Sequence, residues 1–415
     1  MPPPKSRPRS PERPSSVQTL QPISALEDFS LQLAAFVRKN YTPTRFAQGR
    51  LSLGEIHRHA LQELSERFTS NRGVLPPGYL NQPKYRAAYL LYFMLTGVAT
   101  VQHVLQAGAL PQVRADQPLR VLDVGAGPLT ASIALALALP ADTKLQIVAI
   151  DGATPMLEDG RALLRQLRPN ADIRLITGNL RDARLFRDLG APFDVVLVAN
   201  VLNEWQQGGG RKSPVEEYVA QLLQTQLAEN GVAVLVEPAT REASHQLIDV
   251  RETLVQHGEF AILSPCMGQA ACPLSSASMR DWCHAEQPWQ RPSLVRELDD
   301  AIGHRRSTLK YSHLVLARRP QPKAVRDRYR VIGGPMRAGG QFRRYLCGVD
   351  GKVVATTDEH DLGPFQVLAN LWRGDAAVLP GRTSLGRRGR EPETMLQPNE
   401  STAANSPLPQ RNPRK

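Results

Sequence analysis

Long hydrophobic runs and cysteines are both scarce in this sequence. Its most apolar stretch, Ala87 to Val101, is shorter than the roughly 20 residues that a membrane-spanning helix needs, so we expect a buried core helix there. Four cysteines in 415 residues are too few for a secreted domain built on disulfides. The opening residues, MPPPKSRPRSPERPSS, lack the apolar core of a secretory signal, and their prolines prevent an amphipathic transit helix. We therefore expect a cytoplasmic protein without membrane contact.

Acidic residues are outnumbered by basic ones. Lysine and arginine total 51 against 39 aspartates and glutamates, which gives a net charge of +12. An excess of this size favours an anionic partner, usually a nucleic acid, although charged tails on an ordinary basic protein would give the same balance. With 41% hydrophobic residues, the chain has enough apolar material for a sizeable core.

The sequence divides into six segments by composition and periodicity. Leu26, Phe29 and Leu33 recur at helical spacing near the start, whereas strand-like runs begin at Leu119. We expect a disordered proline-rich tail over 1–22, a helical N-terminal section over 23–117, a Rossmann-like domain over 118–260, a cysteine-rich segment with a returning strand over 261–320, a small basic β unit over 321–380, and a disordered basic tail over 381–415.

Five apolar runs between residues 118 and 260 predict strands. They are LRVLDVG, LQIVAID, DIRLITGN, FDVVLVANVL and GVAVLVEP, and helical patterns stand between them at TASIALALAL, 155–168 and 214–229. Strands that alternate with helices indicate an α/β fold with a doubly wound, mostly parallel sheet. A later run, Lys310 to Arg318, predicts a strand that returns to this sheet.

A glycine loop follows the first of these strands. Asp123, Gly125, Ala126 and Gly127 stand directly after the strand and directly before a helix. Glycine lets a backbone turn tightly and approach a ligand closely, and this end of a parallel strand is where open α/β sheets bind ligands. Thr130 occupies the place of the third glycine of a dinucleotide fingerprint, which argues against NAD and FAD, and no GxxxxGK[ST] run is present for a nucleoside triphosphate.

Polar residues follow the next two strands as well. Asp151 ends the second strand, where a carboxylate accepts hydrogen bonds from both hydroxyls of a ribose, and Asn179 follows the third, where an adenine edge would be bound. With the glycine loop, this set resembles the class I S-adenosylmethionine (SAM)-dependent methyltransferases. The alternative is a Rossmann-like fold that has lost its ligand.

The fourth strand ends in Ala199 to Trp205, with the sequence ANVLNEW. In methyltransferases this position faces the reacting group, so Asn200 joins the candidate cofactor residues. The run lacks the Asn/Asp-Pro-Pro-aromatic pattern of amino-methylating enzymes, and no cysteine nucleophile stands near it. Glu204 is a candidate base, but an ordinary carboxylate at a helix start is an equal alternative. We assign no catalytic residue.

All four cysteines fall in the last 150 residues of the chain. Three follow the pattern C-x5-C-x10-C, and the complete set is Cys266, Cys272, Cys283 and Cys347. Clustered cysteines in a basic cytosolic protein favour a metal over disulfides, and four thiolates hold either a [4Fe–4S] cluster or one Zn²⁺. Unrelated buried cysteines are the alternative. His284 is a further candidate for a zinc ligand, although a bystander role fits it better.

Four stretches together resemble one family, the methyltransferase-like proteins of the mitochondrial small ribosomal subunit and their bacterial relatives. The resemblance spans about 85–355 and is carried by VLDVGAGPLTAS, FDVVLVANVLNEW, VEPATREASHQLIDVRETL and SPCMGQAACPL with DWCH. The last stretch is similar to the family's "APCPH…CPL…WCH", and the fourth cysteine stands after RVIGGPMR, as in the family. The chain departs from the family where Leu129 replaces the second glycine of Gly-Pro-Gly and where Gly268 replaces the histidine of Cys-Pro-His.

The resemblance implies a class I methyltransferase fold with bound SAM, a [4Fe–4S] cluster on the four cysteines, and association with small-subunit ribosomal RNA during assembly. Two functions follow. One is a SAM-dependent methyltransferase that acts on ribosomal RNA. The other is a non-catalytic assembly factor in which SAM and the cluster stabilise a platform for RNA. A small-molecule methyltransferase with incidental basic tails is a third, weaker alternative. We expect a monomer.

Basic segments near the C-terminus favour RNA over a small substrate. They cover 326–344 and 382–390, and the aromatic residues Tyr329, Phe342 and Tyr345 interleave with the first of them. Aromatic side chains among arginines are placed to stack on bases, whereas packing in a β-sheet core is the alternative role for the same residues.

Overall fold

The computed structural model describes the chain over residues 24–46, 51–69, 78–107, 110, 113–114, 117–202, 215–275, 281–318, 327–349, 351–379, 381–388 and 391–398. The predicted tail over 1–22 lies outside these residues, as do residues 399–415. Asn203, Glu204 and Trp205, which follow the fourth predicted strand, lie outside them too.

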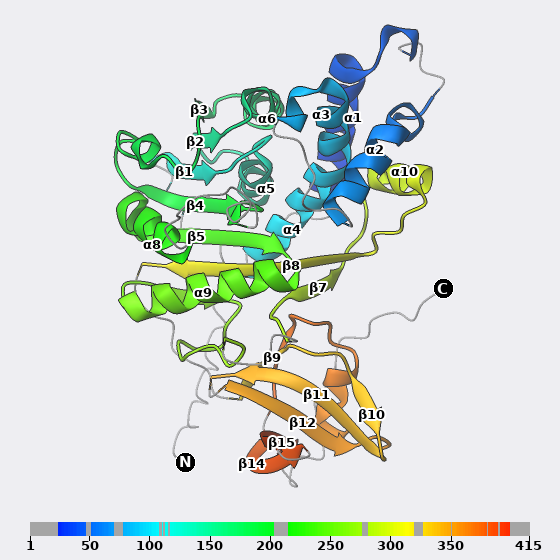
Figure 1. The fold of residues 1–415 in the computed structure, drawn as a ribbon, viewed down its shortest axis with the longest axis vertical. Coiled ribbons are helices and arrows are strands. Elements are labelled where there is room, and N and C mark those ends of the chain that lie inside the picture. The colour runs from blue at the N-terminus through cyan, green and yellow to red at the C-terminus, as the bar shows by residue number, and fades with distance from the viewer. Residues whose placement is uncertain are drawn as a thin grey trace, which may run out of the picture.

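The larger of two sheets has eight strands (Figure 1). Seven form the path β3-β2-β1-β4-β5-β8-β6, and β7 pairs with β8. β1 to β5 run parallel, whereas β8 is antiparallel to β5, β6 and β7. The strands are β1 (Leu119–Val124), β2 (Leu145–Asp151), β3 (Asp172–Thr177), β4 (Phe193–Ala199), β5 (Leu227–Pro238), β6 (Ala261–Ser264), β7 (Ala285–Pro288) and β8 (Thr308–Ala317).

This strand order, with one antiparallel strand inserted between the fifth and sixth, is that of a class I methyltransferase, and it confirms the predicted fold class. The order reverses at β1, which starts both halves of the sheet. Ligands in open α/β sheets bind at such a switch point, outside the carboxyl ends of the strands. The fold therefore places the glycine loop after β1 at the position where a ligand is expected.

Helices cover both faces of the sheet. The α helices are α1 (Ser24–Tyr41), α2 (Leu53–Thr69), α3 (Pro83–Ala88), α4 (Leu95–Gln106), α5 (Thr130–Ala138), α6 (Thr154–Leu167), α8 (Val215–Gln226), α9 (Arg241–His257) and α10 (Ser293–Ile302). Shorter turns are η1 (Thr44–Phe46), η2 (Tyr79–Asn81), η4 (Ala183–Phe186), η5 (Gly363–Ala369) and a π-helical turn, η3 (Tyr89–Met94). Because side chains alternate across a strand, β1 sends Val121 to the core with α1, α4 and α5 and Leu122 to the core with α8 and α9.

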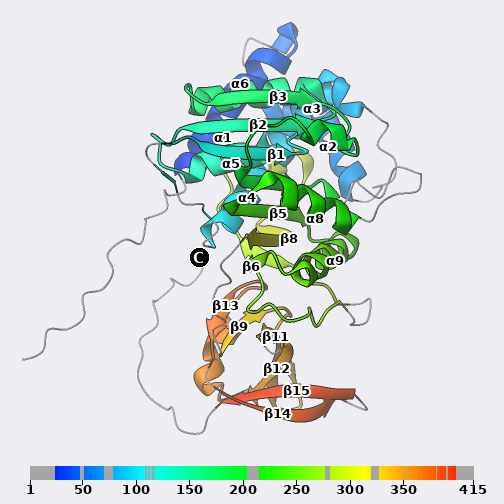
Figure 2. The same ribbon diagram turned by 90° about the vertical axis from the view of Figure 1, so that its left-hand side faces the viewer.

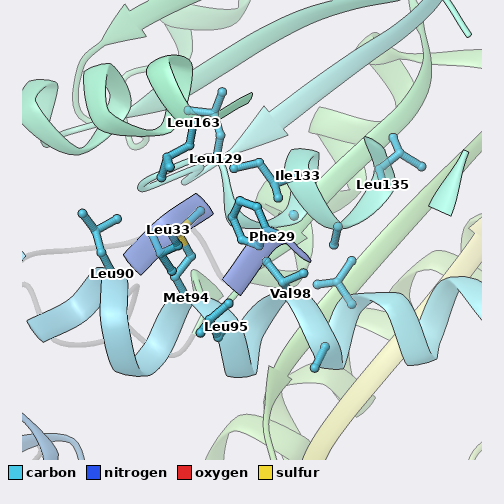
Figure 3. Close-up of a cluster of buried hydrophobic side chains, with 14 of the residues drawn as sticks. Phe29, Leu33, Leu90, Met94, Leu95, Val98, Leu129, Ile133, Leu135 and Leu163 are labelled. Atoms are coloured by element: carbon cyan, nitrogen blue, oxygen red, sulfur yellow. The ribbon is translucent and has the colours of Figure 1, made fainter. Parts of the chain in front are cut away.

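The N-terminal helices pack on the sheet domain through one apolar core (Figure 3). Phe29 and Leu33 of α1 meet Val98 of α4, Ile133 of α5 and Leu163 of α6 there, and all five are almost fully buried. The helical section therefore shares its hydrophobic core with the sheet domain and has no separate core of its own.

The apolar stretch that we predicted to be too short for a membrane lies in a longer helical run. α3, η3 and α4 continue one another over Pro83–Gln106, which is 24 residues and long and apolar enough to cross a bilayer. The length argument was therefore wrong. Burial is the relevant observation, because 67% of its most apolar window lies inside the protein, where α4 packs against α5.

A second sheet of seven strands lies beyond β6 and β8, on the side away from β3 (Figures 1 and 2). Its strands are β9 (Arg328–Val331), β10 (Met336–Ala338), β11 (Gln341–Gly348), β12 (Gly351–Asp358), β13 (Ala376–Val378), β14 (Gly381–Arg388) and β15 (Glu391–Pro398). Tyr329 and Phe342 are buried in its core, so the stacking role that we considered for them is wrong and the packing alternative holds.

The structure contradicts the predicted disorder of the basic tail over its first part. β14 and β15 form a hairpin, and β15 also pairs in parallel with β12 through Val354–Met395 and Ala355–Leu396. Leu396 is fully buried in the core of the second sheet. Composition hid these strands because no apolar run marks them, and backbone pairing and the buried Leu396 join β15 to the second sheet.

Core packing of α1 gives a direct stability test. Replacing the fully buried Phe29 with alanine removes a ring and leaves a cavity, so we expect a loss of about 3–5 kcal/mol of unfolding free energy in denaturant titrations. Leu31 on the same helix is 55% exposed, and L31A is the matched control, with an expected change within about 0.5 kcal/mol. Equal losses in the two variants would contradict the shared core.

Candidate cofactor and cysteine sites

The glycine loop after β1 makes a tight turn against two neighbouring strands. Gly125 and Gly127 have φ of +68° and +50°, a region that favours glycine. The backbone N–H groups of Gly125 and Ala126 donate to the carbonyl oxygen of Ile150 at 2.8 and 3.0 Å. A Cβ on Gly125 would lie 2.2 Å from Cγ2 of Val201, so the loop also approaches the segment after β4 closely.

Asp151 ties the glycine loop to the end of β2. Its Oδ2 accepts the N–H of Gly127 at 2.9 Å, and its Oδ1 accepts the N–H of Ala153 at 2.8 Å. A carboxylate oxygen accepts two hydrogen bonds, so each oxygen keeps acceptor capacity for the hydroxyls of a ligand. Burial raises the pKa of Asp151, while its bonds to backbone N–H groups oppose that shift.

Asp123 lies beneath the loop. Its buried carboxylate accepts from the backbone N–H of Ser132 at 3.1 Å and from its hydroxyl at 2.6 Å. Desolvation raises the pKa of Asp123 to about 6, and the bonds from Ser132 counteract the rise. The geometry gives this residue a supporting role, since it joins β1 to the first turn of α5.

Leu129 stands where the family's Gly-Pro-Gly has its second glycine, and its backbone has a conformation that favours glycine. Its φ is +56°, in the left-handed region, which costs a residue with a side chain about 1–2 kcal/mol. The Leu129 side chain is fully buried in the core with Leu163 (Figure 3), and burial of a leucine contributes about 1.5–3 kcal/mol. The departure from Gly-Pro-Gly is therefore compatible with an intact loop.

The ends of β3 and β4 complete this edge of the sheet. The N–H of Gly178 donates to the carbonyl oxygen of Asp151 at 3.1 Å, which places Asn179 beside the end of β2. Asn200 is exposed, has φ of +59°, and donates its N–H to the carbonyl oxygen of Val236 at 2.8 Å. The structure thus brings the predicted residues after β1, β2, β3 and β4 to one edge, where the exposed amides of Asn179 and Asn200 and the Asp151 carboxylate offer polar groups to a ligand.

Glu237, at the end of β5, is a site residue that the sequence analysis missed. It is 1% exposed, and its Oε1 accepts the N–H groups of Val201 at 2.9 Å and Leu202 at 2.8 Å. This carboxylate fixes the start of the segment after β4 against β5. The signal in the sequence was an acidic residue that ends an otherwise apolar strand.

The four cysteines line a single cavity, which we call the cysteine cavity. Cys266 and Cys272 come from the segment after β6, Cys283 precedes β7, and Cys347 comes from β11 of the second sheet. The segment after β6 lies against the second sheet, since a Cβ on Gly268 would be 3.3 Å from Cα of Val349. Residues far apart in sequence therefore meet between the two sheets.

Burial and mutual proximity raise the pKa values of three of these thiols, those of Cys266, Cys272 and Cys347. Desolvation raises the pKa of Cys272 to about 11 and that of Cys347 to about 12, and the neighbouring cysteines add to both shifts. Cys266 is shifted in the same direction, with burial the main cause and Cys283 contributing. Deprotonating such a group of thiols requires positive charge nearby, which a metal centre supplies.

Two buried arginines also line the cysteine cavity, and the sequence analysis connected neither of them with the cysteines. The Nε of Arg251, on α9, donates to Sγ of Cys266 at 3.4 Å. Arg330, on β9, is 3% exposed, and no partner is present for its Nε and Nη1 among the residues that the structure describes. Within the same described residues, no group of three His, Cys, Asp or Glu side chains is arranged to hold a single metal ion.

A protein-family model matches residues 83–369 of this chain. The family is described as "Mitochondrial small ribosomal subunit Rsm22". The match covers more than half of the chain and confirms the resemblance found in the sequence motifs. No curated protein matches the sequence significantly.

Several solved structures match this chain at low identity. A putative SAM-dependent methyltransferase from Streptococcus mutans is 13% identical over 53% of this chain, with a TM-score of 0.33, and the chain spans about half (48%) of its length. Fibrillarin from Aeropyrum pernix, solved with natively bound S-adenosyl-L-methionine, is 16% identical over 41% of this chain and 69% of its own, with a TM-score of 0.29. The fold assignment rests on the strand order of the chain itself.

Alanine substitutions at the two loop glycines, Gly125 and Gly127, should destabilise the protein to different extents, which tests the geometry of the loop. Gly125→Ala forces a Cβ against Val201 at a positive φ, so we expect a loss of about 2–5 kcal/mol in denaturant unfolding. A Cβ on Gly127 meets nothing within 4 Å, so G127A should cost about 1–2 kcal/mol from its φ alone. A larger loss for G127A than for G125A would contradict the loop conformation.

Proposed function

Because the chain belongs to the Rsm22 family of the mitochondrial small ribosomal subunit, we propose that it is a SAM-dependent methyltransferase-like protein that acts on or binds small-subunit ribosomal RNA. The observation that carries the proposal is the joined edge of β1 and β2, where Asp151 holds the glycine loop and keeps acceptor capacity for a ribose. The open space beside Gly127 leaves room for the rest of the ligand.

The residues at this edge have distinct roles in the proposal. Gly125, Ala126 and Gly127 supply a backbone surface for the methionine part, Asp151 accepts the ribose hydroxyls, and Asn179 lies where an adenine edge is bound. Asn200 lies at the end of β4 beside the methyl group, held by Glu237 through the segment that follows. Asp123 supports the loop through its bonds with Ser132.

SAM supplies an electrophilic methyl group when bound, so the task that remains for the protein is to position the methyl acceptor. In the proposal, the end of β4 would orient an acceptor toward the methyl group, and such orientation alone accounts for a large part of many rate enhancements. The alternative is an assembly factor that keeps SAM and RNA but does not catalyse. Asn200 favours this alternative, since an amide supplies no base.

Ribosomal RNA is the proposed partner on grounds of charge. The second sheet carries exposed Arg328 and Arg337, and the whole chain has a net charge of +12. Phosphate contacts of this kind weaken steeply as salt rises. The family description names the mitochondrial ribosome, whereas our expectation of a cytoplasmic location and a monomer stays a prediction.

We further propose that the four cysteines hold a [4Fe–4S] cluster, with zinc as the alternative. Two observations support a fit. The four thiols line one cavity, and four thiolates are the ligand set of a [4Fe–4S] cluster. The buried Arg330, without partners at Nε and Nη1, provides a positive charge for an anionic group. A bound cluster would supply a rigid, redox-active link between the two sheets.

Asp151→Ala tests the SAM site. Losing the acceptor of two ribose hydroxyls should weaken SAM binding by about tenfold or more in titration calorimetry. Asp172, at the opposite end of β3, accepts only from Gln146 at 3.0 Å, so D172A is the matched control with unchanged affinity. Wild-type affinity in D151A would remove this residue from the site.

Cys347→Ser tests the cysteine site. Because cluster binding is coupled to folding, we expect the C347S variant, when it is prepared without oxygen, to have less iron and lower thermal stability than the wild type. S275A is the control in the same insertion: its hydroxyl only donates to the carbonyl oxygen of Cys272 at 2.7 Å, and it should retain wild-type iron. Stoichiometric zinc without iron in the wild-type protein would refute the cluster and support the alternative.

A further inference from the structure

Arg330 is a buried cation on β9 that lines the cysteine cavity. It extends from β9, where its backbone is opposite Cys347 of β11, and its side chain lines the cysteine cavity. The residue is 3% exposed, yet neither Nε nor Nη1 has a hydrogen-bond partner within the described ranges. A guanidinium is charged at every physiological pH, so its burial is costly unless its N–H groups find acceptors, and an anion would satisfy both the donors and the charge.

Arg251 faces the same cavity from the opposite side. It is 4% exposed and belongs to α9, on the larger sheet. Its Nε donates to Cys266 Sγ at 3.4 Å, and its Nη2 donates to the carbonyl oxygen of Ala270 at 2.6 Å. Arg251 thus orients the segment that carries Cys266 and Cys272, and its charge lies against a sulfur.

Two other charged groups near the cavity, Arg373 and Glu252, have groups of opposite charge in their surroundings, although the Nε of Arg373 also has no hydrogen-bond partner among the described residues. Arg373, which also lies near Cys283, has the carboxylates of Glu286 and Asp281 in its surroundings and donates to the carbonyl oxygen of Trp282 at 2.8 Å. Glu252 accepts from Arg251 Nη1 and from the N–H of Cys272 at 3.0 Å. Arg330 is therefore the cation of this region for which the described residues provide no anion.

We propose that Arg330, assisted by Arg251, is the counter-charge for a dianionic centre on the four cysteines, and that Arg330 sets the reduction potential of that centre. The inference rests on the proposed cluster. Four thiolates contribute −4 and an oxidised [4Fe–4S] core contributes +2, so the centre would carry −2. Arg330 offsets one of these charges, while Arg251, which is paired with Glu252, contributes a hydrogen bond to Cys266. The hydrogen-bond donors at Nε and Nη1 point to the sulfurs as their acceptors.

The charge of Arg330 has a predictable consequence for reduction. Adding one electron to the centre increases its negative charge, and a nearby cation stabilises that product more than the oxidised form. Removing the cation should therefore shift the midpoint potential to more negative values. It should also loosen the centre, since neighbouring groups that hydrogen-bond to metal ligands typically contribute about 10–100-fold to affinity.

The test compares three variants of the full-length protein prepared without oxygen. Arg330→Gln removes the charge, and Arg330→Lys restores it. Arg344→Gln is the matched control, because Arg344 is equally buried in the same sheet but donates to the carbonyl oxygens of Gly333, Leu368 and Leu371 and does not line the cavity. Each protein is titrated with dithionite while the reduced centre is followed by electron paramagnetic resonance, and the rate of iron loss to a chelator is measured.

We expect R330Q to have a more negative midpoint potential and about tenfold faster iron loss, and R330K to return both to near wild type. R344Q should lower the melting temperature but leave the potential unchanged. A wild-type potential and wild-type iron retention in R330Q would overturn the inference while leaving the cluster intact. Zinc in the wild-type protein would overturn the proposed cluster, and the inference about its reduction potential would fail with it. The metal content of the wild-type protein is enough to recognise this outcome.

Discussion

The direction of β8 determines how the rest of the molecule is arranged. β8 runs antiparallel between β5 and β6 and also pairs with β7, so the chain must reverse at this side of the sheet. That reversal leaves the segments after β6 and before β7 on the outside of the sheet, beside the point where the second sheet begins. The hydroxyl of Ser312 in β8 donates to the carbonyl oxygen of Cys283 at 2.9 Å. The cysteine cavity depends on this strand, whereas the glycine loop depends on β1 and β2.

Features that depend on residues close in sequence were predicted correctly. The glycine loop, Asp151 and the first five strands were predictable because turn formation and strand burial depend on neighbouring residues in the chain. Leu129 shows the limit of such reasoning. The sequence marked it as a departure from glycine, but only the packed core shows that its side chain is buried at a left-handed φ. Cofactor contacts by Asp123, Asn179 and Asn200 stay predictions.

Features that depend on distant contacts escaped prediction. Arg330 stood in a basic stretch that favoured RNA, yet its guanidinium is buried beside the cysteines. Tyr329 and Phe342 of the same stretch are buried because alternate residues of β9 and β11 face the core of the second sheet. β14 and β15 were hidden for a related reason, since the pairing of β15 with β12 joins residues about forty positions apart. The charge and composition of a segment can be read from the sequence, but the elements that pack against it in the fold determine which of its side chains are exposed.

The central claim is that the edge built around Gly125 and Asp151 serves chemistry on ribosomal RNA. Its most direct test is transfer of labelled methyl from SAM to small ribosomal subunits and their immature precursors, with Gly125→Arg and Asp151→Ala variants as controls. The account predicts label in RNA with the wild-type protein and little label with either variant. Absence of label from RNA, while the wild-type protein still binds SAM and the precursor particles, would contradict catalysis and identify an assembly factor.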